Sequence, residues 1–424
     1  MDVDDDVTAD PPLDRPLDGV LVLDFSQFLA GPVAAVRLAD LGARVIKVER
    51  PGTGDIGRRL AFAGMELDGD TLSWQVMNRD KEGFAADLKA PDDLAAVREL
   101  VARADVLVHN FRPGVMERLG LGPEEALRLN PRLVHASVTG YGTTGPWRDV
   151  PGQDLLAQAV SGLPWLSGSR TDGPVPVGVS VADLLASIHL AHGVTALLLR
   201  RERTGRGGVV ETSLLEGLLD LQFELLAAHL TDPATTVRRG GPHSAHAFLA
   251  APYGVYPTSD GFLALAMNPL PVLGDLLDLP ALRGCTDPQQ AWTRREEFED
   301  LLATHLRTRP TQAWLDVLQP ADVWCAPVLT LPDLVASEGF ATLEMTQEVH
   351  RPGLDGARHT VATTRSPLRV DGQVLGSRRG APRLGEHTGR LRAEFGLDPG
   401  PGPDPGPKPG PLRERGTVGA GEPA

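Results

Sequence analysis

Short apolar runs alternate with longer amphipathic segments through the first half of this chain. The apolar runs predict buried strands at residues 20–25, 44–49, 104–109 and 133–138. Helical spacing of the apolar positions predicts a helix ending near Leu41 and further helices over residues 92–103 and 123–128. Such alternation of strand and helix is typical of a parallel sheet covered by helices on both faces. The pattern therefore predicts an α/β fold with a doubly wound large domain.

The pattern of apolar and polar positions changes after about residue 225. Residues 253–257 and 262–267 predict a hairpin that turns at Asp260 and Gly261, and short helices such as 315–318 follow. This predicts a smaller α+β domain over residues 225–330. Residues 1–16 are acidic and residues 397–424 form a proline and glycine tract, so both ends are predicted to be disordered.

One acidic side chain stands where an apolar run meets a long helix. Residues 174–182 end at Asp183, and the apolar positions after it keep helical spacing: Leu184, Leu185, Ile188, Ala191, Val194 and Leu198. Free backbone N–H groups and the dipole favour a negative charge at a helix start. Asp183 could be a structural cap or a nucleophile. A third interpretation makes residues 178–182 a serine nucleophile elbow, but Ala182 is a weak substitute for the glycine it needs.

Composition excludes several classes of protein. The net charge of −15 argues against nucleic-acid binding, and we expect no apolar stretch of membrane-spanning length. Two cysteines form neither a disulfide framework nor a zinc site, which fits a cytoplasmic protein. His189 and His192 lack a suitably spaced further ligand, so no metal is expected. No glycine-rich dinucleotide fingerprint opens the first helix, and we expect no permanently bound cofactor.

An ordered set of motifs identifies a family. The set comprises Asp24-Phe25 with Ala30-Gly31-Pro32, Lys47-Val-Glu49-Arg50-Pro-Gly52, Asn78-Arg-Asp-Lys81, Asn110-Phe-Arg-Pro-Gly114, Gly140-Tyr-Gly142 and Pro382-Arg-Leu-Gly-Glu-His-Thr388. Each piece is weak alone, but together they resemble the class III CoA-transferases over residues 17–396. That family includes formyl-CoA and carnitine CoA-transferases and the α-methylacyl-CoA racemases.

The resemblance implies an architecture and an activity. It implies a Rossmann-like large domain of residues 17–215, to which residues 331–396 return after the small domain, in an interlocked homodimer. The implied reaction moves CoA from an acyl-CoA to a carboxylic acid, so the CoA thioester is a substrate. The partners expected are these small molecules and a second copy of the chain.

The resemblance also assigns site residues. Asp183 matches the nucleophilic aspartate of the transferases, and Asp154 matches a second acid near it. The positions that resemble the coenzyme-binding residues of the family are Leu29, Ala30, Arg50, Asn78, Lys81, Asn110, Phe111, Arg112 and Arg118.

Two alternatives stay open beside the transferase. A racemase needs two bases, but Gln153 stands where the racemases carry histidine, and glutamine has no usable basicity. The other alternative is a non-catalytic acyl-CoA binding protein in which Asp183 only caps its helix. The glycine flap of formyl-CoA transferase is reduced here to Gly240-Gly241, followed by His243 and His246. A larger or more apolar acid than formate or oxalate is therefore expected.

Overall fold

The computed structural model describes residues 15–60, 64–234, 239–354 and 356–398. Most of the two predicted disordered ends therefore lies outside the described residues. The chain divides into two compact units: Met1–Thr139, Ser187–Thr212 and Thr346–Ala424 form unit 1, and Gly140–Ala186 and Ser213–Met345 form unit 2. Residues 140–186, which we expected within the large domain of residues 17–215, group with the second unit.

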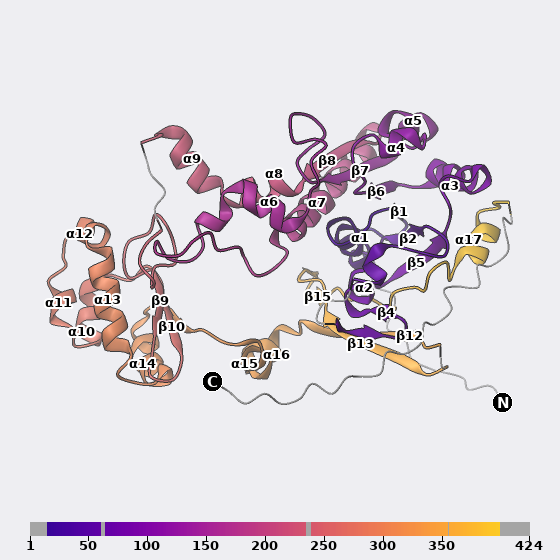
Figure 1. Cartoon of the computed structure of the whole chain (residues 1–424). Coiled ribbons are helices and arrows are strands. Elements are labelled where there is room, and N and C mark those ends of the chain that lie inside the picture. The colour runs from indigo at the N-terminus through magenta and orange to yellow at the C-terminus, as the bar shows by residue number, and fades with distance from the viewer. Residues whose placement is uncertain (1–14, 61–63, 235–238, 355, 399–424) are drawn as a thin grey trace. The chain divides into compact units, whose positions relative to one another are not determined.

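A six-stranded sheet forms the centre of unit 1 (Figure 1). Its strands are β1 (Leu21–Asp24), β2 (Arg44–Glu49), β5 (Lys81–Ala85), β6 (Val106–His109), β7 (Val134–Thr139) and β8 (Gly208–Ser213). Their order is β5-β2-β1-β6-β7-β8, and the pairs β2·β5, β1·β2, β1·β6 and β6·β7 are parallel. Numbered along the chain this is 3-2-1-4-5-6, the doubly wound order of Rossmann folds. The predicted fold class is confirmed.

The helices of unit 1 include the three that the sequence predicts, one ending near residue 41 and two over residues 92–103 and 123–128. They are α1 (Ala30–Asp40), α2 (Leu72–Met77), α3 (Pro91–Arg103), α4 (Val115–Arg118) and α5 (Pro123–Leu129), with the 3-10 turn η1 (Ile56–Arg58). Helices α3 and α5 each start with a proline and carry two acids in the first turn, as helix termini favour. Leu23, Ile46, Leu100 and Leu107 lie fully buried between these helices and the sheet.

The C-terminal segment packs within unit 1 at strand β5, which is an edge strand of the six-stranded sheet. It contains the hairpin β12 (Thr346–Pro352) and β13 (Arg358–Thr364), the strands β14 (Arg369–Val370) and β15 (Gln373–Val374), and α17 (Thr388–Glu394). Helix α17 lies beside edge strand β5 (Figure 1), where the Gly83 N–H donates to His387 Nδ1 at 3.0 Å and the Ala85 N–H to Thr388 Oγ1 at 2.9 Å. The short pair β3 (Glu66–Leu67) and β4 (Asp70–Thr71) completes the unit. The β12–β13 hairpin was not predicted.

Unit 2 contains the predicted hairpin. Strands β9 (Gly254–Pro257) and β10 (Phe262–Leu265) pair antiparallel across a turn at residues 258–261, and β11 (Cys325–Pro327) pairs with β10. The remaining elements are α6 (Asp154–Ser161), η3 (Leu163–Trp165), α8 (Leu214–Leu221), α9 (Phe223–Thr231), α10 (Leu270–Leu276), α11 (Pro280–Arg283), α12 (Pro288–Thr293), α13 (Arg295–Leu306), α14 (Thr311–Leu318), η4 (Gln319–Ala321), α15 (Leu331–Ala336) and α16 (Glu338–Leu343). Tyr256, Phe298 and Trp314 form the core beneath the hairpin.

The long helix α7 (Val181–Thr204) corrects two expectations. It begins before Asp183, so this acid is the third residue of its first turn and not the cap preceding it. It has 24 residues, and an 18-residue window within it has a mean hydropathy of 1.5, so it is long and apolar enough to cross a membrane and the expectation of no such stretch was wrong. Length and composition alone are weak evidence for a span, because core helices of soluble proteins also have them.

Candidate functional site

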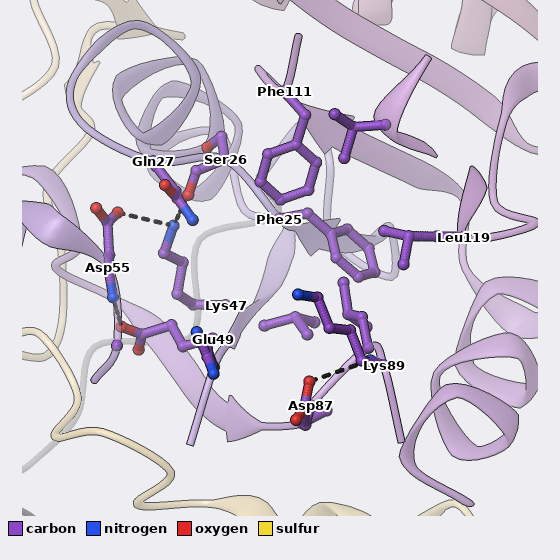
Figure 2. Close-up of a pocket in the computed structure, with 16 residues that line it drawn as sticks. Phe25, Ser26, Gln27, Lys47, Glu49, Asp55, Asp87, Lys89, Phe111 and Leu119 are labelled. Atoms are coloured by element: carbon purple, nitrogen blue, oxygen red, sulfur yellow. Dashed lines mark hydrogen bonds and ion pairs between the residues drawn. The ribbon is translucent and has the colours of Figure 1, made fainter. Parts of the chain in front are cut away.

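A cavity of about 210 Å³ opens at the carboxyl ends of the central strands of unit 1. This edge, at the point where the strand order reverses, is where doubly wound sheets bind ligands. Figure 2 shows Phe25, Phe111 and Leu119 on one side of the cavity and Lys47, Glu49 and Asp55 on the other. The cavity thus offers apolar rings to one part of a ligand and charged groups to another.

Some charged groups that line the cavity are neutralised by buried groups of opposite charge. Lys47 is fully buried and forms ion pairs with Asp55 at 3.3 Å and Asp24 at 3.7 Å. Burial alone would lower the pKa of the Lys47 ammonium, but Asp24, Asp55 and Glu49 outweigh it and raise that pKa. Arg50 and Lys89, by contrast, are exposed where they line the cavity. They are the cations placed to meet a phosphate group.

The structure gathers some of the predicted coenzyme residues and separates others. Arg50 and Phe111 line the cavity. Leu29 precedes the first residue of α1, Ala30, with no side-chain cap. Asn110 holds the loop between β1 and α1, because its side chain accepts the Gln27 N–H at 2.8 Å and donates to the Gln27 carbonyl at 2.6 Å.

Arg112 and Arg118 lie further along the chain from Phe111. Both are exposed, Arg118 is the last residue of α4, and neither lines the cavity. Their assignment to the coenzyme stays a prediction.

Lys81 and Asn78 occupy positions different from those expected of ligand-binding residues. Lys81 is 1% exposed and donates to Asp24 Oδ2 at 2.8 Å, to the Pro32 carbonyl at 2.9 Å and to Asn78 Oδ1 at 2.9 Å. These bonds use all three donors of the ammonium group. Burial, countered by Asp24, lowers the pKa of Lys81 to about 8. The geometry favours a role for both residues in holding β5 and α1 together instead of direct contact with a ligand.

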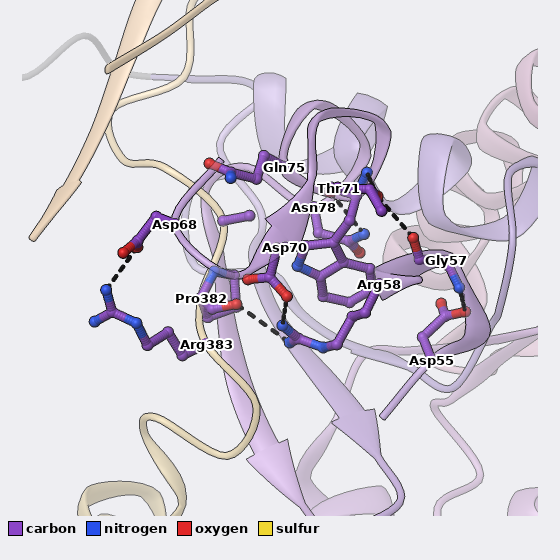
Figure 3. A network of polar contacts seen from close by, with 12 residues as sticks. Asp55, Gly57, Arg58, Asp68, Asp70, Thr71, Gln75, Asn78, Pro382 and Arg383 are labelled. Atoms are coloured by element: carbon purple, nitrogen blue, oxygen red, sulfur yellow. Dashed lines mark hydrogen bonds and ion pairs between the residues drawn. The ribbon is translucent and has the colours of Figure 1, made fainter. Parts of the chain in front are cut away.

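A buried ion network extends from the cavity toward the C-terminal segment. Arg58 pairs with Glu49 at 2.8 Å and with Asp70 at 2.9 Å, donates to the Pro382 carbonyl, and lies 3.9 Å from the centre of the Trp74 ring. Figure 3 shows Arg58 with Asp70 and Pro382, and Arg383 pairing separately with Asp68. Burial opposes ionisation of Glu49, but Arg58 and Lys47 hold the pKa of its carboxyl below the ordinary value.

Asp154 and Asp183, the two predicted catalytic acids, are brought together in unit 2. Asp154 Oδ1 accepts the Ala182 N–H at 2.7 Å and the Asp183 N–H at 3.3 Å, while Oδ2 accepts from Gln158 at 2.8 Å. Asp154 is 6% exposed, whereas Asp183 is half-buried. The amide groups of the first turn of α7 are therefore bonded by Asp154, which takes the capping role that the sequence assigned to Asp183.

Other candidate groups have ordinary structural surroundings. Gln153 is the N-cap of α6, and its side-chain oxygen accepts the Leu155 N–H at 3.1 Å. His243 stacks on Tyr256 and His246 meets Tyr253 edge-on. Across the described residues, no group of three or more histidine, cysteine and acidic side chains could hold a metal.

Sequence reasoning missed Lys47, Asp55 and Lys89. Lys47 could have been noticed, because a lysine in the middle of a buried strand must find a partner or cost free energy. Asp55 carried only the weak local signal of an acid that caps the short turn η1, and its pairing with Lys47 and with the Phe28 N–H depends on other segments.

Comparison with known proteins agrees with this arrangement. A model of CoA-transferase family III matches residues 17–388, so the chain belongs to that family and is an enzyme of the CoA-transferase class. It is 34% identical over 394 residues to an acetyl-CoA:oxalate CoA-transferase of Acetobacter aceti, covering 90% of this chain and 96% of the relative. It is 30% identical over 386 residues to a succinyl-CoA:glutarate CoA-transferase of Mus musculus, covering 90% and 86%.

Solved structures show the same fold. A CAIB/BAIF family protein from Brucella suis superposes with a TM-score of 0.78 at 29% identity, covering 90% of this chain and 99% of the other. A protein from Mycobacterium tuberculosis gives a TM-score of 0.75 at 30% identity, covering 88% and 98%.

Proposed function

We propose that this enzyme transfers CoA from an acyl-CoA to a carboxylic acid through covalent intermediates on Asp183. The observation that carries the proposal is the capping of α7 by Asp154. Asp154 accepts the Ala182 and Asp183 N–H groups, so it supplies a carboxylate cap for this turn beside the Asp183 side chain. The place of Asp183 in the first helical turn favours the ionised form, which is the form that attacks a carbonyl carbon.

The reaction proceeds in balanced steps. The Asp183 carboxylate attacks the thioester carbonyl and the carbon–sulfur bond breaks. CoA thiolate departs, and an acyl-aspartyl anhydride remains on the enzyme. The thiolate then attacks the Asp183 carbonyl and releases the donor as a free carboxylate, which leaves an aspartyl-CoA thioester. The acceptor carboxylate attacks the carbonyl of that thioester, the carbon–sulfur bond breaks, and CoA thiolate departs as a second anhydride forms. The thiolate finally attacks the acceptor carbonyl, giving the new acyl-CoA and regenerating Asp183.

Asp154 acts as a positioning residue in this scheme. It holds the backbone of Ala182 and Asp183, and Gln158 holds Asp154 in turn. We place the nucleotide part of CoA in the cavity of unit 1, where Arg50 and Lys89 meet phosphate charge and Phe111 contacts an apolar face. No permanently bound cofactor takes part.

A dicarboxylic acid is the acceptor class we propose. The names of the relatives include oxalate, glutarate and mesaconate as partners of the transfer. The short glycine pair at Gly240-Gly241 led us to expect an acid larger than oxalate, and glutarate meets both conditions.

Gln153 separates this proposal from racemisation. Its side chain caps α6, and an amide has no basicity with which to remove an α-proton. A racemase would exchange the α-hydrogen of its substrate with solvent and form no covalent adduct.

The experiment is adduct trapping. The protein is incubated with acetyl-CoA or succinyl-CoA, treated with hydroxylamine or borohydride, and mapped by peptide mass spectrometry. We expect the modification on Asp183, its loss in Asp183→Asn, and its retention in Asp154→Asn, whose Oδ1 can still accept both N–H groups. Deuterium at the α-carbon without an adduct would establish the racemase instead. Binding of CoA with neither signal would identify a non-catalytic binding protein.

We also propose a homodimer. Helices α9 and α15 contain no buried residue, yet they expose Phe223, Leu230, Leu331 and Val335 by 60% or more. Large exposed apolar groups of this kind mark interaction surfaces. Light scattering after size exclusion tests this, and a monomeric mass would contradict it. A cytoplasmic location fits the free thiols of Cys285 and Cys325.

A further inference from the structure

The loop that joins β1 to α1 is held by side chains at five consecutive backbone polar atoms. Asp24 accepts the Ser26 N–H at 2.9 Å, and Lys47 donates to the Ser26 carbonyl. Asn110 bonds both the N–H and the carbonyl of Gln27. Asp55 accepts the Phe28 N–H at 3.3 Å. Loops are usually solvated and mobile, so side-chain control of each backbone group in turn is unusual.

Phe28 is strained at the end of this loop. Its φ is 64°, in the left-handed region that residues with a Cβ rarely adopt, and its side chain is 49% exposed. Such a backbone persists only where the surrounding structure enforces it, and it is characteristic of functional sites. Strain and an exposed aromatic ring coincide at one residue next to Gln27, which lines the cavity.

The means of enforcement is the buried pair of Lys47 and Asp55. Both side chains are essentially unexposed, and they approach to 3.3 Å. Asp55 Oδ1 accepts the N–H groups of Phe28 and of Gly57, at 3.3 Å and 2.9 Å, so one carboxylate ties the loop to the start of η1. Gly31 leaves room for this arrangement, because a Cβ there would lie 2.2 Å from the Cβ of Ser26.

We propose that Lys47 and Asp55 are positioning residues for the coenzyme, which lock residues 26–28 so that Phe28 keeps its left-handed backbone and contacts the bound acyl-CoA. Neither residue belongs to the set that the family resemblance assigns. The inference rests on the proposed function, because it takes the cavity to be the coenzyme site.

Amide hydrogen exchange tests the lock without any substrate. In Asp55→Ala the Phe28 amide loses its acceptor, and we expect its exchange to be faster by at least about tenfold. The matched control is Asp40→Ala, which removes another buried acid of unit 1, paired with Arg79 at 2.7 Å and bonded to no atom of the loop. Equal exchange at Phe28 in Asp55→Ala and Asp40→Ala would overturn the proposal.

Calorimetry with free CoA then tests the consequence. We expect the Kd for CoA to rise about tenfold in Asp55→Ala, because a disordered loop must be ordered again on binding. Asp55→Asn keeps an oxygen for the Phe28 and Gly57 N–H groups but loses the ion pair with Lys47, so its Kd should lie between those of Asp55→Ala and the original protein. Asp40→Ala should leave the Kd unchanged even where it lowers the Tm. An unchanged Kd in Asp55→Ala, despite faster exchange, would refute positioning.

Phe28→Gly separates the ring from the fold. Glycine adopts a left-handed φ without strain, so we expect a Tm no lower than that of the original protein. The Kd for CoA should nevertheless rise, because the contact of the ring is lost. A Kd within twofold of the original would remove Phe28 from the proposal. Failure of the original protein to bind CoA would reject the proposed function, while the exchange result would still decide whether the loop is locked.

Discussion

Two buried acids of unit 1, Asp24 and Glu49, and one buried acid of unit 2, Glu299, are held in opposite ways. In unit 1, Asp24 and Glu49 each lie against buried cations, and these cations hold the pKa of both carboxyls below their ordinary values despite burial. In unit 2, Glu299 is 1% exposed, and within the described residues neither of its oxygens has a hydrogen-bond partner of good geometry. Burial raises the pKa of Glu299 to about 7, and nearby Arg295 offsets this only in part.

The difference teaches which acids hold the fold together and which retain freedom to react. A buried carboxylate bonded to a cation is fixed in the charged state, because separating the pair would leave two uncompensated charges. Asp154 differs from both kinds of buried acid, because backbone N–H groups and the Gln158 amide donate hydrogen bonds to its carboxylate. Nucleophilic chemistry is proposed for Asp183, beside Asp154, and titration near neutral pH is expected of Glu299. Both belong to unit 2.

The largest expected effect is the loss of turnover when the proposed nucleophile of unit 2 is replaced. Asp183→Asn should lower turnover by at least about 10³-fold, because an amide cannot form the anhydride. Its Tm should change little, since Asp154 bonds the helix terminus. Steady-state assays with acyl-CoA and dicarboxylates, together with thermal melts, provide the test. Substantial turnover in this variant would reject the mechanism.

The second effect removes a cation from the paired network of unit 1. Arg58→Met leaves Glu49 buried without its arginine, while Asp70 keeps its second ion pair, with Arg351 at 2.8 Å. We expect a loss of about 3 kcal/mol in the free energy of unfolding. Urea denaturation measures it. The control is Arg128→Met, which breaks an exposed pair with Glu125 and should leave the free energy of unfolding nearly unchanged. Equal losses in the two variants would show that burial of the network has no consequence.

The third effect concerns the acid of unit 2 without a cation of its own. Folded Glu299 keeps its proton up to about pH 7, whereas the unfolded chain releases it near pH 4.5. Folding therefore takes up a proton between these values, and stability falls as pH rises through this window. Glu299→Gln removes the penalty and should stabilise the protein by about 2–3 kcal/mol at pH 8 and by little below pH 4.5.

Urea denaturation at several pH values checks this prediction. Glu297→Gln is the matched control, because Glu297 is exposed and pairs with Arg294 on the surface. The control should show no comparable gain at pH 8. Stabilisation by Glu299→Gln that is the same at pH 4 and pH 8 would contradict the assignment of a raised pKa.

The smallest effect distinguishes a cap from a positioning residue. Asp154→Ala should cost about 1 kcal/mol, the usual value of a lost helix cap, and should also slow turnover through misplacement of Asp183. Ser213 caps α8, and its hydroxyl accepts the Glu216 N–H at 3.1 Å. Ser213→Ala removes this cap. It should cost a similar amount with turnover retained. Melts and kcat for both variants test this, and equal kcat values would limit Asp154 to capping.

The sequence by itself determined the sheet and the identity of the candidate nucleophile. Strand and helix periods are local, because burial of one face repeats along a single segment, and the order of these segments led to the doubly wound fold. The hairpin of β9 and β10 was equally visible, since Asp260-Gly261 is a turn signal between two apolar runs. Asp183 stood out because an isolated acid begins a long apolar helix.

Only the tertiary structure decided which partner each charged group has. Asp154 caps a helix that begins 27 residues later in the chain (181 − 154), and no local pattern links the two. Lys81 matched a binding motif, yet Asp24, Pro32 and Asn78 use all of its donors in the interior. Lys47 lies in β2, and Asp55 caps η1 after that strand, so the two pair only because the loop between them folds back on the strand. Hydrogen bonds and ion pairs depend on distances in space, and the spacing of residues along a chain contains no such distances between separate elements.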